Sequence, residues 1–399
     1  MITTKRTTPS SLGNIVFFGT PAYGHVNPTL PMITELRKCG YHVIYYATEE
    51  FRQAVEACGA TFRAYDFGDI PWTPQVGSRI LELTELLLRF TDAQMDELLR
   101  QTKELHPVLV LHDTIAFWGR AVAQTLGIRA ASVNTIITAY RYTGKAFFLY
   151  ATRFSGTSLK ELKAIPGILK YKRRLKKQYG IKRTDLLGVL MNEEKFNVFT
   201  YPCPVHPEGT RENRFFLGPA AVLREDTFEE EEDYSYDNLI YVSLGTIFNA
   251  GPEFYRAVLS QFGGTKYTVV ISCGKNYEWL KREAIPSNVI VKPYVNQKKV
   301  MQRAKLFLTA GGMNSICEAA AYGVPCLLYP QQGEQALNAR MFRKLGLGKV
   351  IRNERRLFRE AERLLREYAP APEVSSEFSV VRLEEFMERL ANYQKTGEC

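Results

Sequence analysis

The sequence predicts an α/β protein of two tandem Rossmann-like domains, each built on a parallel β-sheet. Short apolar runs of strand length alternate with runs of helix length, a pattern typical of βαβ units. The alternation occurs in two series, and a segment rich in proline, glycine, asparagine and acidic residues separates them. A length of 399 residues suits two domains better than one. We therefore expect a ligand site in the crevice between the domains, at the carboxyl ends of the strands.

The first series begins close to the N-terminus. Strands are expected at residues 14–18, 41–47, 108–112 and 129–133. Helices are expected at residues 28–38, 49–58 and 118–126, with Gly40 and Gly59 as stop signals after the first two. The alternation is then expected to end.

The second series follows the acidic run EDTFEEEED at residues 225–233, which is typical of a solvated linker. Strands are expected at residues 239–244, 267–272, 288–291, 305–309 and 325–329. Helices are expected at residues 252–262, 297–303, 314–322 and 335–345. These limits give a first domain over residues 1–222, a linker over 223–237 and a second domain over 238–375.

The composition is that of an ordinary globular protein. Apolar residues make up 45% and charged residues 24% of the chain. The N-terminal stretch lacks the apolar segment of a signal peptide, and no run of about 18 uncharged apolar residues could span a membrane. The seven cysteines form no CxxC pair and no Cys/His cluster, so we expect neither a metal site nor a disulfide framework. A cytoplasmic protein fits these features.

One basic segment, KYKRRLKKQYGIKR at residues 170–183, carries eight basic residues and no acidic residue. Ile168, Tyr171, Leu175 and Tyr179 are spaced to share one face of a helix there. The simplest interpretation is a solvated helix, and a weak contact with a membrane surface or an anionic partner is the alternative. Nucleic-acid binding is not expected, because no recognisable nucleic-acid module accompanies the segment.

A histidine and an aspartate follow two strands of the first domain. His25 lies in GTPAYGHVNP, on the expected loop after the first strand, and Asp113 follows the strand in VLVLHDT. The carboxylate could accept the imidazole N–H, fix the tautomer and stabilise the imidazolium. Alternatively, Asp113 only caps the next helix. The motifs GxSxG and HExxH and a P-loop are absent.

The second domain places small and polar residues after three strands. VSLGT puts Ser243 and Gly245 at a strand end, where a phosphate could approach closely or the chain could simply turn. AGGMNSICE at residues 310–318 reads as a glycine-rich turn entering a helix, which is suited to an anion, with Glu318 placed for ribose hydroxyls. PQQGEQ brings Glu334 and Gln335, whose side chains could bind sugar hydroxyls.

These motifs together resemble the bacterial macrolide-type, UDP-sugar-dependent glycosyltransferases. The resemblance rests on GHVNP, SLGT and PYVNQ…AGGMNSICEAAAYGVPCLLYPQQGEQ, and it extends over nearly the whole chain. It implies the GT-B fold of two facing Rossmann-like domains, an acceptor-binding first domain and a nucleotide-sugar-binding second domain. It also implies that residues 376–399 form a C-terminal helix that packs back on the first domain.

The resemblance implies an inverting transfer of a hexose from a UDP-sugar, without a metal or other cofactor, to a hydroxyl of a hydrophobic small molecule such as a macrolide or polyphenol. His25 would be the general base and Asp113 its orienting partner. Tyr294 would stack on the uracil, and Glu334 and Gln335 would read the sugar. The donor site implied in full is Ser243, Gly245, Thr246, Tyr294, Val295, Gln297, Ala310, Gly312, Met313, Asn314, Ser315, Glu318, Glu334 and Gln335.

The chain departs from the family pattern twice. Ala310 stands where the family usually has histidine, so a phosphate-contacting imidazole is missing. Asn296 stands where it usually has proline, which should alter the stiffness of the loop more than the chemistry.

Three functions follow as hypotheses. The first is a glycosyltransferase acting on a natural product, with an acceptor pocket lined by residues 67–89 and 136–154. The second, which Ala310 motivates, is a catalytically weak or non-enzymatic nucleotide-binding relative. The third, which the basic segment motivates, is a membrane-surface lipid glycosyltransferase. The sequence determines neither the acceptor and sugar nor the oligomeric state.

Overall fold

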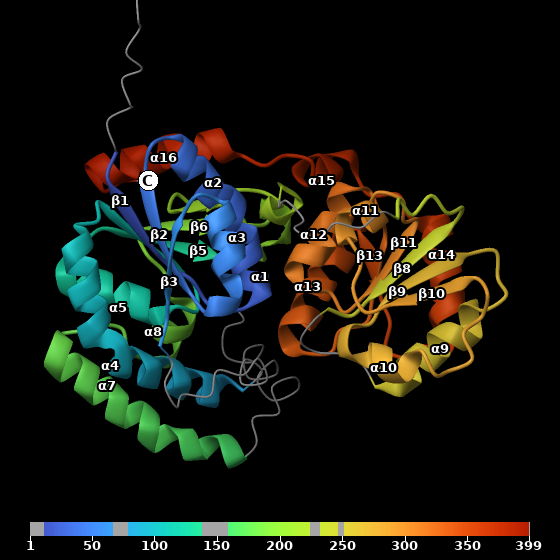
Figure 1. Cartoon of the computed structure of the whole chain (residues 1–399), viewed down its shortest axis with the longest axis horizontal. Coiled ribbons are helices and arrows are strands. Elements are labelled where there is room, and N and C mark those ends of the chain that lie inside the picture. Colours follow the sequence, from blue (N-terminus) through green and yellow to red (C-terminus); the bar gives the residue numbers. More distant parts are fainter. Residues whose placement is uncertain (1–11, 67–78, 138–158, 224–231, 246–250, 399) are drawn as a thin grey trace, which may run out of the picture.

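The computed structural model describes residues 12–66, 79–137, 159–223, 232–245 and 251–398. They form two α/β lobes that face each other (Figure 1). The first lobe has a seven-stranded sheet of order β3-β2-β1-β4-β5-β6-β7 and the second a six-stranded sheet of order β10-β9-β8-β11-β12-β13. Every neighbouring pair of strands in both sheets is parallel. The predicted fold class is confirmed.

The first lobe places helices on both faces of its sheet. Its strands are β1 Asn14–Phe18, β2 His42–Ala47, β3 Thr61–Ala64, β4 Leu109–Asp113, β5 Ala130–Asn134, β6 Phe196–Phe199 and β7 Arg214–Phe216. Its helices are α1 Tyr23–Val26, α2 Leu30–Lys38, α3 Arg52–Ala57, α4 Ile80–Leu105, α5 Phe117–Leu126, α7 Ile165–Tyr179 and α8 Leu186–Met191. The strands β1, β2, β4 and β5 are almost wholly buried, as parallel strands covered on two faces must be.

The second lobe repeats this arrangement. Its strands are β8 Leu239–Ser243, β9 Thr268–Ser272, β10 Val289–Lys292, β11 Leu306–Thr309, β12 Cys326–Leu328 and β13 Gly348–Val350. Its helices are α9 Pro252–Phe262, α10 Tyr277–Leu280, α11 Gln297–Met301, α12 Met313–Ala321, α13 Gly333–Lys344, α14 Leu357–Glu367 and α15 Pro372–Glu377.

The expected end of the first alternation is wrong. Two more parallel strands, β6 and β7, extend the first sheet beyond β5. They contain only four and three residues, so their apolar signal is short. Helix α4, with 26 residues, was also not predicted from the sequence. Helix α7 forms in the basic segment, and its stripe of Ile168, Tyr171, Leu175 and Tyr179 packs into the same core as α4.

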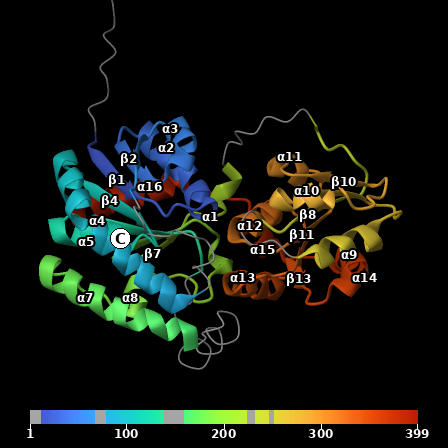
Figure 2. The ribbon, with the colours of Figure 1, turned by 60° about the horizontal axis from the view of Figure 1, so that its bottom comes forward.

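The last helix, α16 Leu383–Thr396, returns to the first lobe. Phe386, Leu390 and Tyr393 lie in the core of the first sheet, and the Tyr393 hydroxyl donates to the Ala130 carbonyl at 2.8 Å. Phe378, which the expected boundary at residue 376 assigns to this helix, still packs against Phe342 of α13 in the second lobe. The chain therefore crosses between the lobes just after Phe378 (Figure 2).

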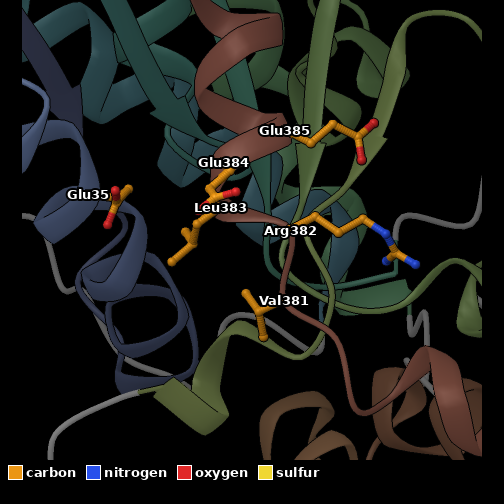
Figure 3. Close-up of a pocket in the computed structure, with 6 residues that line it drawn as sticks. All are labelled: Glu35, Val381, Arg382, Leu383, Glu384 and Glu385. Carbon is orange, nitrogen blue, oxygen red and sulfur yellow. The ribbon is translucent and has the colours of Figure 1, made fainter.

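Where the crossing segment meets α2, it leaves a surface hollow (Figure 3). Glu35, Glu384 and Glu385 line it together with Val381, Arg382 and Leu383. Arg382 forms an ion pair with Glu377 at 3.0 Å. Because carboxylates dominate its lining, this hollow is poorly suited to a nucleotide diphosphate.

Candidate active site

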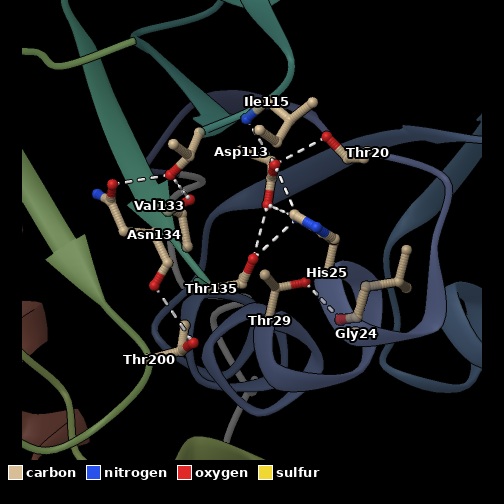
Figure 4. A network of polar contacts seen from close by, with 12 residues as sticks. Thr20, Gly24, His25, Thr29, Asp113, Ile115, Val133, Asn134, Thr135 and Thr200 are labelled. Carbon is tan, nitrogen blue, oxygen red and sulfur yellow. Dashed lines mark hydrogen bonds and ion pairs between the residues drawn. The ribbon is translucent and has the colours of Figure 1, made fainter. Parts of the chain in front are cut away.

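His25 and Asp113 meet at the carboxyl edge of the first sheet, where β1 and β4 end side by side (Figure 4). The imidazole Nδ1 lies 2.9 Å from Oδ2 and 3.0 Å from Oδ1 of the carboxylate. The His25 side chain is 15% exposed and that of Asp113 is 1% exposed. His25 lies on the short helix α1, not on a loop as expected, and Asp113 is the last residue of β4. The structure thus brings together the two residues expected to form a pair.

Four donors hold the Asp113 carboxylate. Besides the imidazole, the Thr20 hydroxyl donates to Oδ1 at 2.7 Å and the Ile115 backbone N–H at 2.8 Å. The Thr135 hydroxyl donates to Oδ2 at 3.3 Å. Helix α5 begins after Ala116, so Asp113 does not occupy its N-cap position. The capping alternative does not describe the role of this carboxylate.

This environment sets the protonation of the pair. With Nδ1–H directed at Asp113, the neutral imidazole keeps the lone pair of Nε2 for a proton. Burial lowers the pKa of His25, but the charge and hydrogen bond of Asp113, with Glu334 adding to them, raise it above the ordinary value. Burial raises the pKa of Asp113, but His25 and the donors Ile115 and Thr20 bring it below the ordinary value. The site favours a charged imidazolium–carboxylate pair after proton uptake.

Thr20 and Thr135 also contact the pair, although they were not predicted as site residues from the sequence. Thr135 is buried directly after β5, and its hydroxyl oxygen lies 2.9 Å from Nδ1 of His25. β5 is the neighbour of β4, so the carboxyl-end argument that selected Asp113 also applies to Thr135. Thr20 stands within the quoted segment GTPAYGHVNP. A search for every polar residue just past these strands would have found both.

In the second lobe, helix α12 begins directly after the turn that follows β11, and the first N–H groups of a helix have no partner within the helix. Gly311 has φ +88°, in the left-handed region that favours glycine. A Cβ on Gly312 would have no atom within 4 Å, so the start of α12 is open. Helix α12 has nine residues, and its positive end points out of this turn. The geometry suits an anion such as a phosphate.

Three of the expected donor-site side chains form one cluster. The Gln297 amide, at the start of α11, donates to Glu318 and lies 3.4 Å from the Ser315 hydroxyl. The Glu318 side chain is largely buried within α12. Tyr294 is 60% exposed, so a face of its ring is available for stacking. Asn296, in place of the family's proline, caps α11, because its side-chain oxygen accepts the Lys299 N–H at 3.0 Å.

Other residues expected to bind the sugar donor already form hydrogen bonds within the protein or are buried. The Asn314 amide donates to the Gly24 carbonyl of the first lobe at 3.1 Å. The Gln335 side-chain oxygen accepts the Gln331 N–H at 2.8 Å, so this bond uses one of its two lone pairs. The Met313 side chain is buried in an apolar cluster beside Cys317, so only the Met313 backbone can reach a ligand.

The remaining expected positions lie at strand ends or in packed regions. Ser243 ends β8, and Gly245 has φ +87° with open space where a side chain would be. Val295 is partly buried against an apolar cluster that includes residues of both lobes, and the Ala310 methyl group is buried in the cluster that α9 and α14 form with the second sheet. Thr246 lies outside the described residues.

The two lobes approach each other at His25. Glu334, at the start of α13, is close enough to raise the pKa of His25, and His25 in turn lowers that of Glu334. Burial nevertheless raises the pKa of Glu334 above its ordinary value, while Asn338 donates to its carboxylate at 2.9 Å. Together with the contact between Asn314 and Gly24, this places the base opposite the start of α13.

Among the residues that the structure describes, no group of three or more His, Cys, Asp and Glu side chains could hold a metal ion. In the same residues, no helix has the length and apolar content that a membrane crossing needs. The segments expected to line an acceptor pocket lie mostly outside the described residues, apart from the first part of α4 and residues 136 and 137.

Comparison with known proteins identifies the family. A model of the glycosyltransferase family 28 C-terminal domain matches residues 250–390. The NDP-glycosyltransferase YjiC of Bacillus licheniformis is 31% identical over 358 residues, covering 86% of this chain and 85% of the relative. Oleandomycin glycosyltransferase of Streptomyces antibioticus is 26% identical over 365 residues, covering 88% and 81%.

Solved structures agree on the fold. The glycotransferase of kitacinnamycin superposes with a TM-score of 0.76 at 23% identity, covering 97% of this chain and 100% of that chain. The calicheamicin glycosyltransferase CalG4 gives 0.74 at 23% identity, covering 96% and 99%. The chain therefore belongs to the bacterial nucleotide-sugar-dependent glycosyltransferases of the GT-B fold, the family that includes the macrolide glycosyltransferases.

Proposed function

We propose that this glycosyltransferase moves a hexose from a UDP-sugar to a hydroxyl group of a hydrophobic small molecule, with inversion at the anomeric carbon. The observation that carries the proposal is the His25–Asp113 pair, buried at a strand edge and opposite the start of α13. A lone histidine could be structural, but three other donors hold its carboxylate partner in place, and that carboxylate fixes the orientation of the imidazole.

His25 acts as the general base in this proposal. Its Nε2 takes the proton of the acceptor hydroxyl as the hydroxyl oxygen attacks the anomeric carbon. The new carbon–oxygen bond forms on the face opposite the diphosphate, and the bond to the diphosphate breaks with its electrons remaining on UDP. A single displacement of this kind inverts the anomeric configuration. Asp113 stabilises the imidazolium formed in the step.

The second lobe binds the donor. The backbone N–H groups after Gly311 and the positive end of α12 stabilise the charge that develops on the leaving diphosphate. Gln297 and Glu318 bind the ribose hydroxyls, and the exposed Tyr294 ring stacks on the uracil. Glu334 and the amide of Gln335 bind the sugar. The proposed reaction needs no divalent metal, because helix N–H groups and the helix dipole supply the stabilisation.

A natural-product acceptor is supported by the relatives. The names of similar proteins include oleandomycin glycosyltransferase and demethyllactenocin mycarosyltransferase. The acceptor of this chain is proposed only as a hydrophobic molecule with a free hydroxyl, such as a macrolide or polyphenol.

A donor-by-acceptor assay tests the proposal. The protein is incubated with single UDP-sugars and panels of phenolic and macrolide acceptors, and products are identified by mass spectrometry and by NMR of the anomeric proton. We expect a β-linked product from an α-linked UDP-hexose, and equal rates with EDTA and with Mg²⁺. Retained configuration would refute the single displacement, and activity that depended on added metal would refute metal independence. Binding of UDP without transfer to any acceptor would favour the non-enzymatic hypothesis that Ala310 motivates.

A further inference from the structure

Helix α7 presents a face that the glycosyltransferase site does not use. The helix runs along the outer edge of the first lobe beside α4 (Figure 1, Figure 2). Its inner face is committed to α4, where Leu175 is buried, Arg174 forms an ion pair with Asp92 at 3.1 Å, and the Tyr179 hydroxyl donates to Asp96. Asp92 and Asp96 of α4 are therefore paired with α7 along this inner seam, and Glu85 of α4 faces α7 at Gly167.

The outer face carries apolar and basic side chains in sequence. Ile165, Leu169, Lys172 and Lys176 recur at the spacing of one helix face. Ile165 is 39% exposed and Leu169 is 43% exposed, and Leu162 in the preceding turn is 47% exposed. The apolar residues occupy the N-terminal half of the face, and the lysines occupy the C-terminal half.

Cations gather at the C-terminal end of α7. Lys172, Lys176, Lys182 and Arg183 line a shallow hollow there, together with Gly180, Ile181, Thr184 and Asp185. The Asp185 carboxylate is committed to the Gly188 N–H at 3.0 Å as the cap of α8. Among the described residues, none of these four cations makes an ion pair with an acidic side chain. The hollow thus holds a surplus of positive charge next to exposed leucine and isoleucine.

We propose that the outer face of α7 docks on an anionic lipid bilayer. Lipid phosphates would occupy the basic hollow, and Leu162, Ile165 and Leu169 would enter the boundary between head groups and acyl chains. The apolar side chains decide between a membrane and a nucleic acid, since a phosphate backbone alone gains nothing from them. The inference concerns binding only, and it does not rest on the proposed reaction.

Vesicle flotation with the full chain tests the inference. Vesicles of phosphatidylcholine alone are compared with vesicles of equal parts phosphatidylcholine and phosphatidylglycerol. We expect binding only to the anionic vesicles, with release at about 1 M salt, where the screening length is only about 3 Å. Absence of binding to the anionic vesicles at low salt would overturn the inference.

Two variants separate charge from insertion. The triple variant Lys172→Gln, Lys176→Gln, Lys182→Gln should weaken binding about a hundredfold, at about fivefold per charge removed. The double variant Ile165→Gln, Leu169→Gln should weaken it roughly tenfold through lost apolar burial. The changed side chains lie on the surface, and circular dichroism checks that the fold is kept.

A matched control comes from the second lobe. Arg343→Gln with Lys344→Gln removes two exposed cations from the last turn of α13 and should leave vesicle binding unchanged. An equal loss per charge removed in this control would mean that net charge, not the α7 face, is responsible. The inference would be overturned if the double variant Ile165→Gln, Leu169→Gln bound the anionic vesicles as tightly as the unchanged protein. It would also be overturned if the protein bound an RNA duplex more tightly than the anionic vesicles.

Discussion

The two lobes arrange their polar groups in opposite ways. In the first lobe, the Asp113 carboxylate is 1% exposed and accepts hydrogen bonds from three donors besides His25, so it holds the His25 ring in one orientation. In the second lobe, Gly245 and Gly312 lie at open turns, Gln297 pairs with Glu318, and Tyr294 is 60% exposed. Proton transfer needs one precise geometry, whereas donor binding draws on several contacts that each contribute part of the affinity.

This difference predicts how substitutions divide between the lobes. Changes at the buried pair should act on turnover, because the base cannot be replaced by a neighbour. Changes in the second lobe should act on donor affinity and should be graded.

The largest effect is expected for His25→Ala. Removal of a general base lowers turnover by roughly 10²–10⁴-fold, while affinity for the UDP-sugar changes little because His25 belongs to the other lobe. Steady-state kinetics and calorimetry with UDP measure the two quantities. His106→Asn, at an exposed histidine after α4, is the control and should keep normal turnover. Near-normal turnover of His25→Ala would remove the contrast between the lobes.

A smaller effect is expected for Glu318→Ala. Loss of charged hydrogen bonds to ribose hydroxyls costs about 1.5–3 kcal/mol, which is about 10- to 150-fold in affinity for UDP. Calorimetry with UDP measures it, and Glu283→Ala, which removes a surface partner of Arg256, is the control. If UDP bound to Glu318→Ala as tightly as to the unchanged protein, the ribose would have to bind elsewhere.

Thr135→Val should have an intermediate to small effect on turnover alone. The substitution keeps the shape of the side chain but removes a hydrogen bond to the His25–Asp113 pair, worth about 0.5–1.5 kcal/mol. We expect a decrease of roughly 2- to 10-fold in kcat with unchanged donor affinity. Rescue by Thr135→Ser would support a positioning role. A change confined to thermal stability would mean that Thr135 serves packing only.

The smallest net effect is expected for Ala310→His. An imidazole would restore the family's donor near the phosphate turn, which should raise donor hydrolysis or transfer a few-fold. The Ala310 methyl is buried in the core of the second lobe, so the larger ring should also cost about 1–3 kcal/mol of stability. Unfolding curves and donor hydrolysis separate the two effects. A variant that loses both stability and donor binding would show that the position cannot host the missing contact.

The sequence predicted best what depends on local pattern. The alternating runs located β1, β4, β8 and β11, and the carboxyl-end rule selected His25 and Asp113, which the structure brings to 2.9 Å. The sequence did not predict elements whose position depends on tertiary contacts. The short strand β7 is held in place by pairing with β6 more than by its three residues, and nothing local marks it.

The hydrogen bonds that side chains form within the folded protein were also not predicted from the sequence. Gln335 turns its oxygen to Gln331, and Asn314 reaches across to the first lobe. The first bond is local but depends on the backbone at the start of α13, and the second joins groups that are 290 residues apart. The catalytic and donor-binding roles of these residues remain predictions, which the substitutions above address.

The pair also predicts opposite pH dependences of activity and stability. The pKa of His25 is raised above its ordinary value of 6.5 in the folded protein. The imidazolium–carboxylate pair therefore stabilises the fold fully below pH 6.5, and this contribution is lost as the pH rises through the folded pKa. Activity needs the neutral imidazole, so it should increase over the same window.

The pH profile of kcat/KM, compared between the unchanged protein and Asp113→Asn, tests the central claim most directly. The unchanged protein should lose activity toward acid with an apparent pKa above 6.5. Without the carboxylate charge, burial of the imidazole acts almost alone and lowers its pKa, so the acid limb of Asp113→Asn should move to lower pH while the maximum rate falls. An acid limb at the same pH in both proteins would contradict the account, because His25 would then not titrate as the base that Asp113 controls.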